Sequence, residues 1–102
     1  MTYSLILDLG TSITRNPPLG STKTYQSEEQ SFNHCLLEGI LYVYDVDSLI
    51  KCMNKCNEWG PKCKAFSYSK NSRQCFLNGL KKKNAVKAAF VYKYGFLHYE
   101  TV

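Results

Sequence analysis

Long apolar runs are absent from this sequence of 102 residues. Its longest apolar stretches, residues 36–43 and 88–92, are strand-length and far shorter than the roughly 20 residues that a membrane-spanning helix needs. The N-terminal residues also lack the basic start of a secretory signal peptide, and Asp8 interrupts their only apolar run. We therefore expect no direct insertion into a membrane.

Histidine is scarce as well. The two histidines are His34, which adjoins Cys35, and His98. Neither belongs to a recognisable set of serine, histidine and aspartate, so the sequence offers no activated nucleophile of the kind that covalent catalysis requires. We expect a protein that is not an enzyme and that carries no cofactor.

Cysteine is missing from the first third of the chain, and all five cysteines fall between positions 35 and 75. Such clustering in a short chain is typical of a disulfide framework formed in an oxidising compartment. Because no signal peptide is recognisable, we expect this chain to be part of a larger secreted or cell-surface protein. The alternative is a cytosolic protein with reduced thiols.

Residues 1–31 differ in composition from the remainder, since they are rich in serine, threonine, proline and glycine. This composition favours a flexible arm or linker. Residues 32–102 are then the folded domain.

A helix is predicted over residues 48–59. Asp47 or Ser48 can cap its first turn, and Gly60 followed by Pro61 favours its termination. Its apolar residues recur at positions i, i+3, i+4 and i+7, which places them on one face; they are Leu49, Cys52, Met53 and Cys56.

Strands are predicted on both sides of this helix. Residues 40–46, "ILYVYDV", are β-branched and aromatic. Residues 62–77 contain two strand-like runs, "KAFSYS" and "QCFL", around the polar turn "KNSR", and so predict a hairpin. One or two further strands are expected around "AFVYKY" and "FLHYE", whereas "NAVKAA" suits either a helical turn or a loop.

The order of the cysteines suggests how they pair. Cys63 follows the helix after a tight Gly-Pro turn, so it can fold back to Cys56 at the nearer helix end. Cys75, on the second hairpin strand, can then reach Cys52. The competing interpretation is a zinc site with the spacing C-x3-C-x6-C-x11-C, but zinc sites usually carry C-x2–4-C pairs on both sides. We therefore predict two disulfides and no metal.

The stretch from residue 47 to 79 resembles the core of a PAN/apple domain. The shared features are a helix bearing C-x3-C, a third cysteine directly ahead of an aromatic strand ("KAFSY") and a fourth cysteine in a "CFL" strand. The resemblance covers about residues 32–100 and implies the same pairing, Cys52–Cys75 and Cys56–Cys63. It also implies an α+β fold, in which a curled antiparallel sheet of about five strands packs on one α-helix.

The sequence departs from the six-cysteine members of this family, in which the first cysteine pairs with the last. Cys35 lies where the first would be, and the sequence ends at Val102 without the last. Either the partner lies beyond the end of the sequence, or Cys35 is a free thiol as in the four-cysteine members. We predict that Cys35 is unpaired in this chain.

The resemblance implies an extracellular binding or adhesion module that recognises proteins or carbohydrates. The alternative is a structural or regulatory module of a larger secreted protein, such as a protease, with no ligand of its own. A cytosolic protein that binds zinc or nucleic acid is a distant third, and we expect no nucleic-acid partner.

Charge favours an acidic ligand. Residues 1–59 hold four Lys or Arg against seven Asp or Glu, whereas residues 60–102 hold nine against Glu100 alone. A basic half suggests partners such as acidic glycans or acidic proteins, although scattered lysines can also serve solubility alone. The candidate ligand-binding residues are Lys81, Lys82, Lys83, Lys87 and Arg73, and Lys62 and Lys64 can join the group, like Arg73, across the hairpin.

Aromatic side chains are the second candidate group. Tyr68, Tyr92 and Tyr94 can offer flat faces to a sugar, or they can pack within the sheet, as the alternation of a strand favours. Trp59, at the end of the predicted helix, is expected to cover the core.

Overall fold

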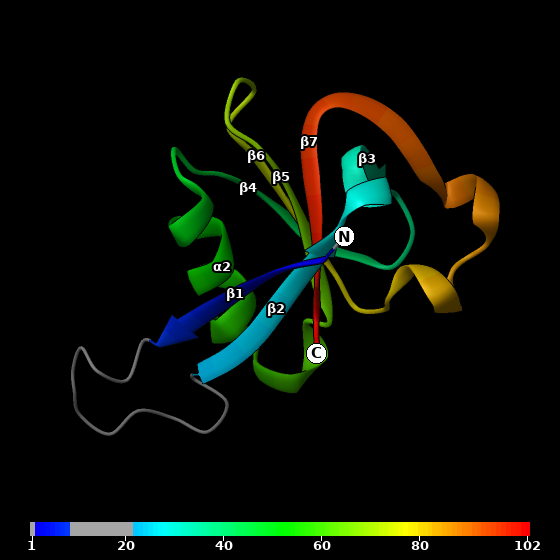
Figure 1. Cartoon of the computed structure of the whole chain (residues 1–102). Helices are drawn as coiled ribbons and strands as arrows, with labels where there is room; N and C mark the ends of the chain where they lie inside the picture. The colour runs from blue at the N-terminus through cyan, green and yellow to red at the C-terminus, as the bar shows by residue number, and fades with distance from the viewer. Residues whose placement is uncertain (1, 9–21) are drawn as a thin grey trace.

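A computed structural model of the chain describes residues 2–8 and 22–102. These residues form a seven-stranded antiparallel sheet with the strand order β1-β2-β7-β5-β6-β4, and β3 pairs with β7 beside this path (Figure 1). One α-helix, α2, lies among them. The strands and the helix are β1 (Thr2–Asp8), β2 (Thr22–Glu28), β3 (Phe32–Leu36), β4 (Ile40–Asp45), α2 (Leu49–Glu58), β5 (Ala65–Ser69), β6 (Gln74–Asn78) and β7 (Phe90–Thr101).

The predicted helix is confirmed as α2. Ser48 provides the N-cap, because its side-chain oxygen accepts a hydrogen bond from the backbone N–H of Lys51 at 3.2 Å. Gly60 follows the last turn with φ of +64°, a conformation that glycine adopts without steric cost. Pro61 lies in a short 3₁₀ turn, Gly60–Lys62, and the chain then enters β5.

The predicted hairpin is also confirmed, as β5 and β6 with a turn at residues 70–73 between them. The stretch "NAVKAA" contains parts of two single 3₁₀ turns, η3 (Lys82–Asn84) and η4 (Lys87–Ala89). The two C-terminal runs form one continuous strand, β7. Its first part pairs with β3 and its last part pairs with β5 and β2, and Gly95 has φ of +89° between the two parts.

Residues 32–102 supply five strands, β3 to β7, as predicted, whereas residues 22–31, which were predicted to be part of a flexible arm, belong to the fold. β1 and β2 pair with each other, and β2 pairs with β7. Tyr25 of β2 is fully buried and donates a hydrogen bond from its hydroxyl to Oδ1 of Asn57 in α2 at 2.6 Å. Residues 9–21 of the predicted arm lie outside the described residues.

Lys23 is a second reason why this segment belongs to the fold. Its ammonium group donates hydrogen bonds to three backbone carbonyls at the end of α2, those of Cys56 (3.3 Å), Gly60 (2.7 Å) and Cys63 (3.2 Å). An ammonium group has three N–H donors, so all three are satisfied. Burial, together with the nearby charge of Lys64, lowers the pKa of Lys23. Positive charge near the last carbonyls of a helix is favourable.

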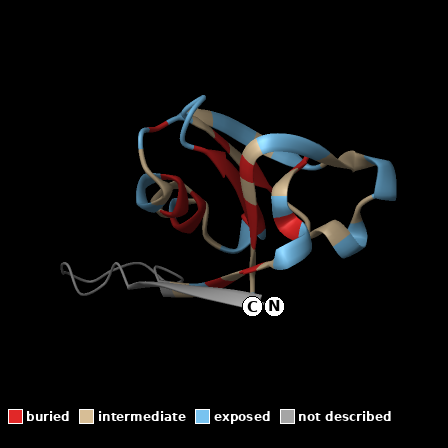
Figure 2. Ribbon diagram, turned by 45° about the horizontal axis from the view of Figure 1, so that its top comes forward, coloured by how far each residue is buried: buried red, intermediate tan, exposed pale blue. Residues whose placement is uncertain are grey.

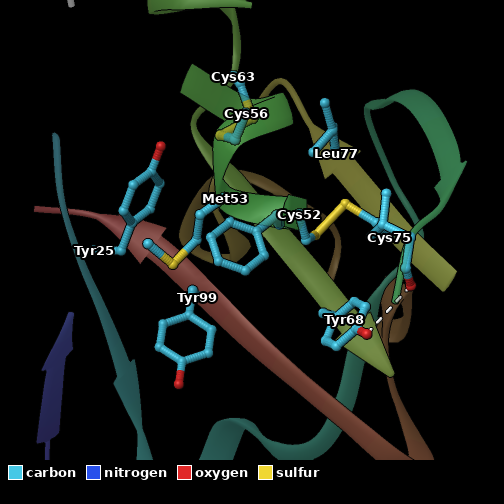
Figure 3. Packing of buried hydrophobic residues seen from close by; sticks show 11 residues of the cluster. Tyr25, Cys52, Met53, Cys56, Cys63, Tyr68, Cys75, Leu77 and Tyr99 are labelled. Atoms are coloured by element: carbon cyan, nitrogen blue, oxygen red, sulfur yellow. Dashed lines mark hydrogen bonds between the residues drawn. A yellow bond between two sulfur atoms is a disulfide. The ribbon is translucent and has the colours of Figure 1, made fainter. Parts of the chain in front are cut away.

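The main core lies between α2 and the sheet (Figures 2 and 3). The disulfide Cys52–Cys75 joins α2 to β6, and Cys56–Cys63 joins the end of α2 to the residues ahead of β5. Both predicted pairs are therefore confirmed, and their sulfurs are not available as zinc thiolates. The buried cluster consists of Tyr25, Val46, Cys52, Met53, Cys56, Cys63, Phe66, Tyr68, Cys75, Leu77 and Tyr99.

Candidate functional site: a basic surface beside β7

The connection between β6 and β7, residues 79–89, carries most of the candidate lysines. Figure 1 shows it on the side of the sheet away from α2, beside β3 and the first part of β7. We call the exposed and half-exposed lysines of this region the basic surface. It consists of Lys64, Lys81, Lys82, Lys83 and Lys87.

Two carboxylates hold this connection in place. The backbone N–H of Lys82 donates to Oε2 of Glu100 at 2.7 Å, and the backbone N–H of Val86 donates to Oε1 of Glu38 at 2.8 Å. Hydrogen bonds to an ionised acceptor are among the stronger ones in proteins. The lysines therefore project from an anchored segment.

Glu100 is itself held by a buried polar chain. His98 Nε2 lies 2.8 Å from Oε2 of Glu100, and His98 Nδ1 lies 2.7 Å from Oγ of Ser67. The His98 ring therefore bridges the carboxylate of Glu100 and the hydroxyl of Ser67. Burial acts to raise the pKa of Glu100, but the hydrogen bonds from His98 and from the Lys82 backbone outweigh it, so the pKa lies below its ordinary value.

Sequence reasoning missed this chain of contacts because its members lie on different strands. The residue types are those of a serine–histidine–carboxylate set, yet Ser67 and His98 have no exposed surface. A substrate therefore cannot reach the hydroxyl in this conformation. Ser67 also accepts the backbone N–H of Leu36 at 3.3 Å, so the chain ties β3, β5 and β7 together and orients Glu100 under η3.

Three neighbouring hollows mark the basic surface. The largest, of about 600 Å³, has Lys82 and Lys87 in its lining. A second of about 300 Å³ is lined by Lys81, Lys82 and Lys83 among others, and a third of about 230 Å³ by Lys64, Lys81 and Lys83 among others. Lys82 lines the first and second hollows, and Lys81 and Lys83 line the second and third. Acidic side chains also contribute, Glu29 to the first hollow and Glu28 and Glu100 to the second.

Aromatic rings line the largest hollow together with its lysines. Phe32, His34 and Phe90 all contribute to it. The rings of His34 and Phe90 stack with centroids 4.9 Å apart, and Nζ of Lys82 lies 5.2 Å from the Phe90 centroid. A ligand in this hollow would therefore meet both positive charge and flat apolar faces.

Glu28 partly occupies the same surface. Its Oε1 lies 3.0 Å from Nζ of Lys82, at the boundary between the two larger hollows. An acidic group on a ligand would compete with Glu28 for Lys82. The carboxylate of Glu28 would thus compete with an anionic ligand for Nζ of Lys82.

Other candidate residues lie elsewhere. Arg73 is in the hairpin turn between β5 and β6 and pairs with Asp45 at 2.9 Å, so the structure does not bring it to the basic surface. Tyr68 is part of the core. Trp59 packs against that core, as expected, and its indole N–H donates to the hydroxyl of Tyr44 at 3.1 Å.

Cys35, in β3, is the free cysteine among the five, all of which the structure describes, and it is fully buried. Burial raises the pKa of the Cys35 thiol despite a hydrogen bond with Ser67 and the charge of Lys93. A buried thiol with a raised pKa is a poor nucleophile. This thiol is therefore part of the packing around β3.

The described part of the chain has neither a metal cluster nor a membrane-spanning helix. Within residues 2–8 and 22–102, no group of three or more His, Cys, Asp or Glu side chains converges as a metal site. Those residues also contain no helix with the length and apolar character needed to cross a membrane.

Comparison with known protein families gives a match over most of the chain. A family model described as PAN domain matches residues 23–101. The match begins within β2 and includes every later strand, α2 and both disulfides. A search of curated proteins found no match.

Proposed function

We propose that this chain, which belongs to the PAN domain family, is an extracellular module that binds acidic carbohydrate through its basic surface. PAN domains are non-catalytic modules of protein and carbohydrate recognition. The observation that carries the proposal is that three hollows share the lysines of residues 81–83, with Lys87 also lining the largest of them. Two disulfides suit a protein that works outside the cell.

The ligand class follows from the chemistry of the lining. Lysine is a flexible point charge with three donors, so it accepts sulfate or carboxylate groups in several geometries. Several lysines around shared hollows favour a ligand with repeated negative groups. An acidic polysaccharide has such repeats, and its sugar rings can also lie on aromatic faces.

Retention on a heparin column tests this proposal. Replacing all three of Lys81, Lys82 and Lys83 by serine should lower the salt concentration at which the protein elutes. Screening limits attraction between exposed charges to about 8 Å at physiological ionic strength, so that only lysines close to the bound heparin hold it. Thermal stability should change little, since an ion pair that water can reach, such as that of Lys82 with Glu28, contributes only about 0–1 kcal/mol.

A matched variant controls for net charge. Lys51 and Lys55 pair with residues in or next to α2, and Lys70 is in the hairpin turn, so replacing these three with serine removes the same charge elsewhere. The control should elute close to the wild type. Equal elution of both triple variants would show that only net charge matters and would refute the proposed surface. Binding of an acidic protein but of no glycan would refute the carbohydrate class.

A further inference from the structure

We propose that the basic surface continues into an aromatic row, which binds consecutive sugar rings of an extended acidic polysaccharide. The row consists of Phe90, Tyr92 and Tyr94 of β7 and His34 of β3. This inference rests on the proposed function. It places the bound polysaccharide along a path that begins at the lysines and follows the first part of β7.

The row follows from the geometry of a strand. Alternate residues of a strand share one face and lie about 6.6–6.8 Å apart, so Phe90, Tyr92 and Tyr94 follow one another at intervals suited to flat rings. His34 joins them from the neighbouring strand. Its ring stacks on Phe90 at 4.9 Å and meets Tyr92 edge to face at 5.8 Å.

The two outer rings are unusually exposed. Tyr92 is 68% exposed and Tyr94 is 77% exposed, and they lie in the exposed arch of β7 that Figure 2 shows in pale blue. Single exposed aromatic side chains are ordinary, but contiguous ones mark interaction sites. They are not part of the main core, to which the last part of β7 contributes Tyr99.

Charge connects this row to the lysines. Phe90 and His34 line the largest hollow together with Lys82 and Lys87. A chain with acidic groups in that hollow would pass directly onto Tyr92. The charge complementarity favours a polyanion, and the row of flat rings favours one with ring faces to stack.

Binding should therefore have two components. The lysines give a component that weakens as salt rises. Stacking on Tyr92 and Tyr94 gives a component that depends little on salt but requires a ligand long enough to reach both rings. Short oligosaccharides should occupy only the hollow.

Heparin oligosaccharides of two lengths, a tetrasaccharide and a dodecasaccharide, provide the test by calorimetry. The variant Tyr92→Ser with Tyr94→Ser should bind the dodecasaccharide about tenfold more weakly than the wild type, as expected for the loss of two aromatic contacts. Its affinity for the tetrasaccharide should not change. Tyr42→Ser, at another exposed tyrosine on β4, is the control and should bind both ligands normally.

The outcomes separate this inference from the proposed function. Weaker binding by the lysine variant, with normal dodecasaccharide binding by the tyrosine variant, would overturn the aromatic row alone. Normal binding by the lysine variant would overturn the proposed function. Suppose that the wild type binds single-stranded DNA of similar charge as tightly as it binds the dodecasaccharide, and that the tyrosine variant does not bind the DNA. That result would overturn the assignment of the ligand as a sugar. A dimer of the wild type that the tyrosine variant dissociates, with glycan binding unchanged, would show that the row contacts a second copy.

Discussion

Single side chains on the basic surface have opposing roles. Lys82 takes part in an ion pair through its side chain and in an anchoring hydrogen bond through its backbone. Glu28 restrains the side chain, whereas Glu100 fixes the backbone. Changing these two carboxylates should therefore have different effects, one on binding and the other on stability.

Glu28→Gln should strengthen binding to heparin. The substitution keeps the shape of the side chain but removes the charge that competes for Nζ of Lys82 at 3.0 Å. We expect elution at a higher salt concentration than the wild type. Glu58→Gln, which makes the same change in net charge at the end of α2, is the control. The prediction fails if both variants shift equally.

Glu100→Gln should destabilise the protein in a manner that depends on pH. The folded-state pKa of Glu100 lies below its ordinary value of 4.5, so its stabilising contribution is complete above that pH and is lost as the pH falls through the folded value. We expect the variant to be less stable by about 1.5–3 kcal/mol at pH 7. Unfolding of both proteins by urea between pH 7 and pH 3 measures this difference, which should shrink in acid. A difference that stays constant with pH would contradict the role given to the carboxylate.

At the level of secondary-structure elements, β2 completes the core between α2 and the sheet. Tyr25 is buried between α2 and the sheet and stacks edge to face on Phe66, with ring centroids 5.3 Å apart. Lys23 caps the end of the same helix. The core therefore depends on a strand that the composition of residues 1–31 does not predict.

A chain of residues 32–102 should consequently fail to fold cooperatively, whereas residues 22–102 should fold. Removing residues 22–31 takes away Tyr25, and loss of a large buried aromatic side chain costs about 3–5 kcal/mol, a large share of the roughly 5–15 kcal/mol of a typical domain. Thermal unfolding followed by circular dichroism compares the two chains. Equal midpoints would show that β2 is dispensable.

For the molecule as a whole, the two disulfides constrain the unfolded chain to different extents. Cys52 and Cys75 are separated by 23 positions, and Cys56 and Cys63 by 7. A longer closed loop removes more entropy from the unfolded state. The four sulfur atoms are all buried, so the cost of the cavities left by alanine is similar for both pairs.

Replacing Cys52 and Cys75 with alanine should therefore lower the free energy of unfolding more than replacing Cys56 and Cys63, by about 1 kcal/mol from loop entropy. Both variants should remain less stable than the wild type by roughly 2–4 kcal/mol. Urea unfolding under non-reducing conditions gives the values. A larger loss from the Cys56–Cys63 pair would show that tying the end of α2 matters more than loop length.

The sequence by itself determined the elements whose signals are local. α2 follows from the period of Leu49, Cys52, Met53 and Cys56 and from the stop at Gly60, and the hairpin follows from two β-favouring runs around a polar turn. The spacing of four cysteines around these elements, together with the resemblance to PAN/apple domains, then predicted both disulfides.

Only the tertiary structure decided the position of β2, the buried contacts of Ser67, His98 and Glu100, and the grouping of the lysines around shared hollows. Each of these depends on contacts between residues far apart in the sequence. Tyr25, for example, is buried because α2 and Phe66 of β5 pack against it, although its neighbours in the sequence are polar. Burial of a strand and convergence of side chains on different strands are consequences of packing. They cannot be predicted from the composition of a short window of the sequence.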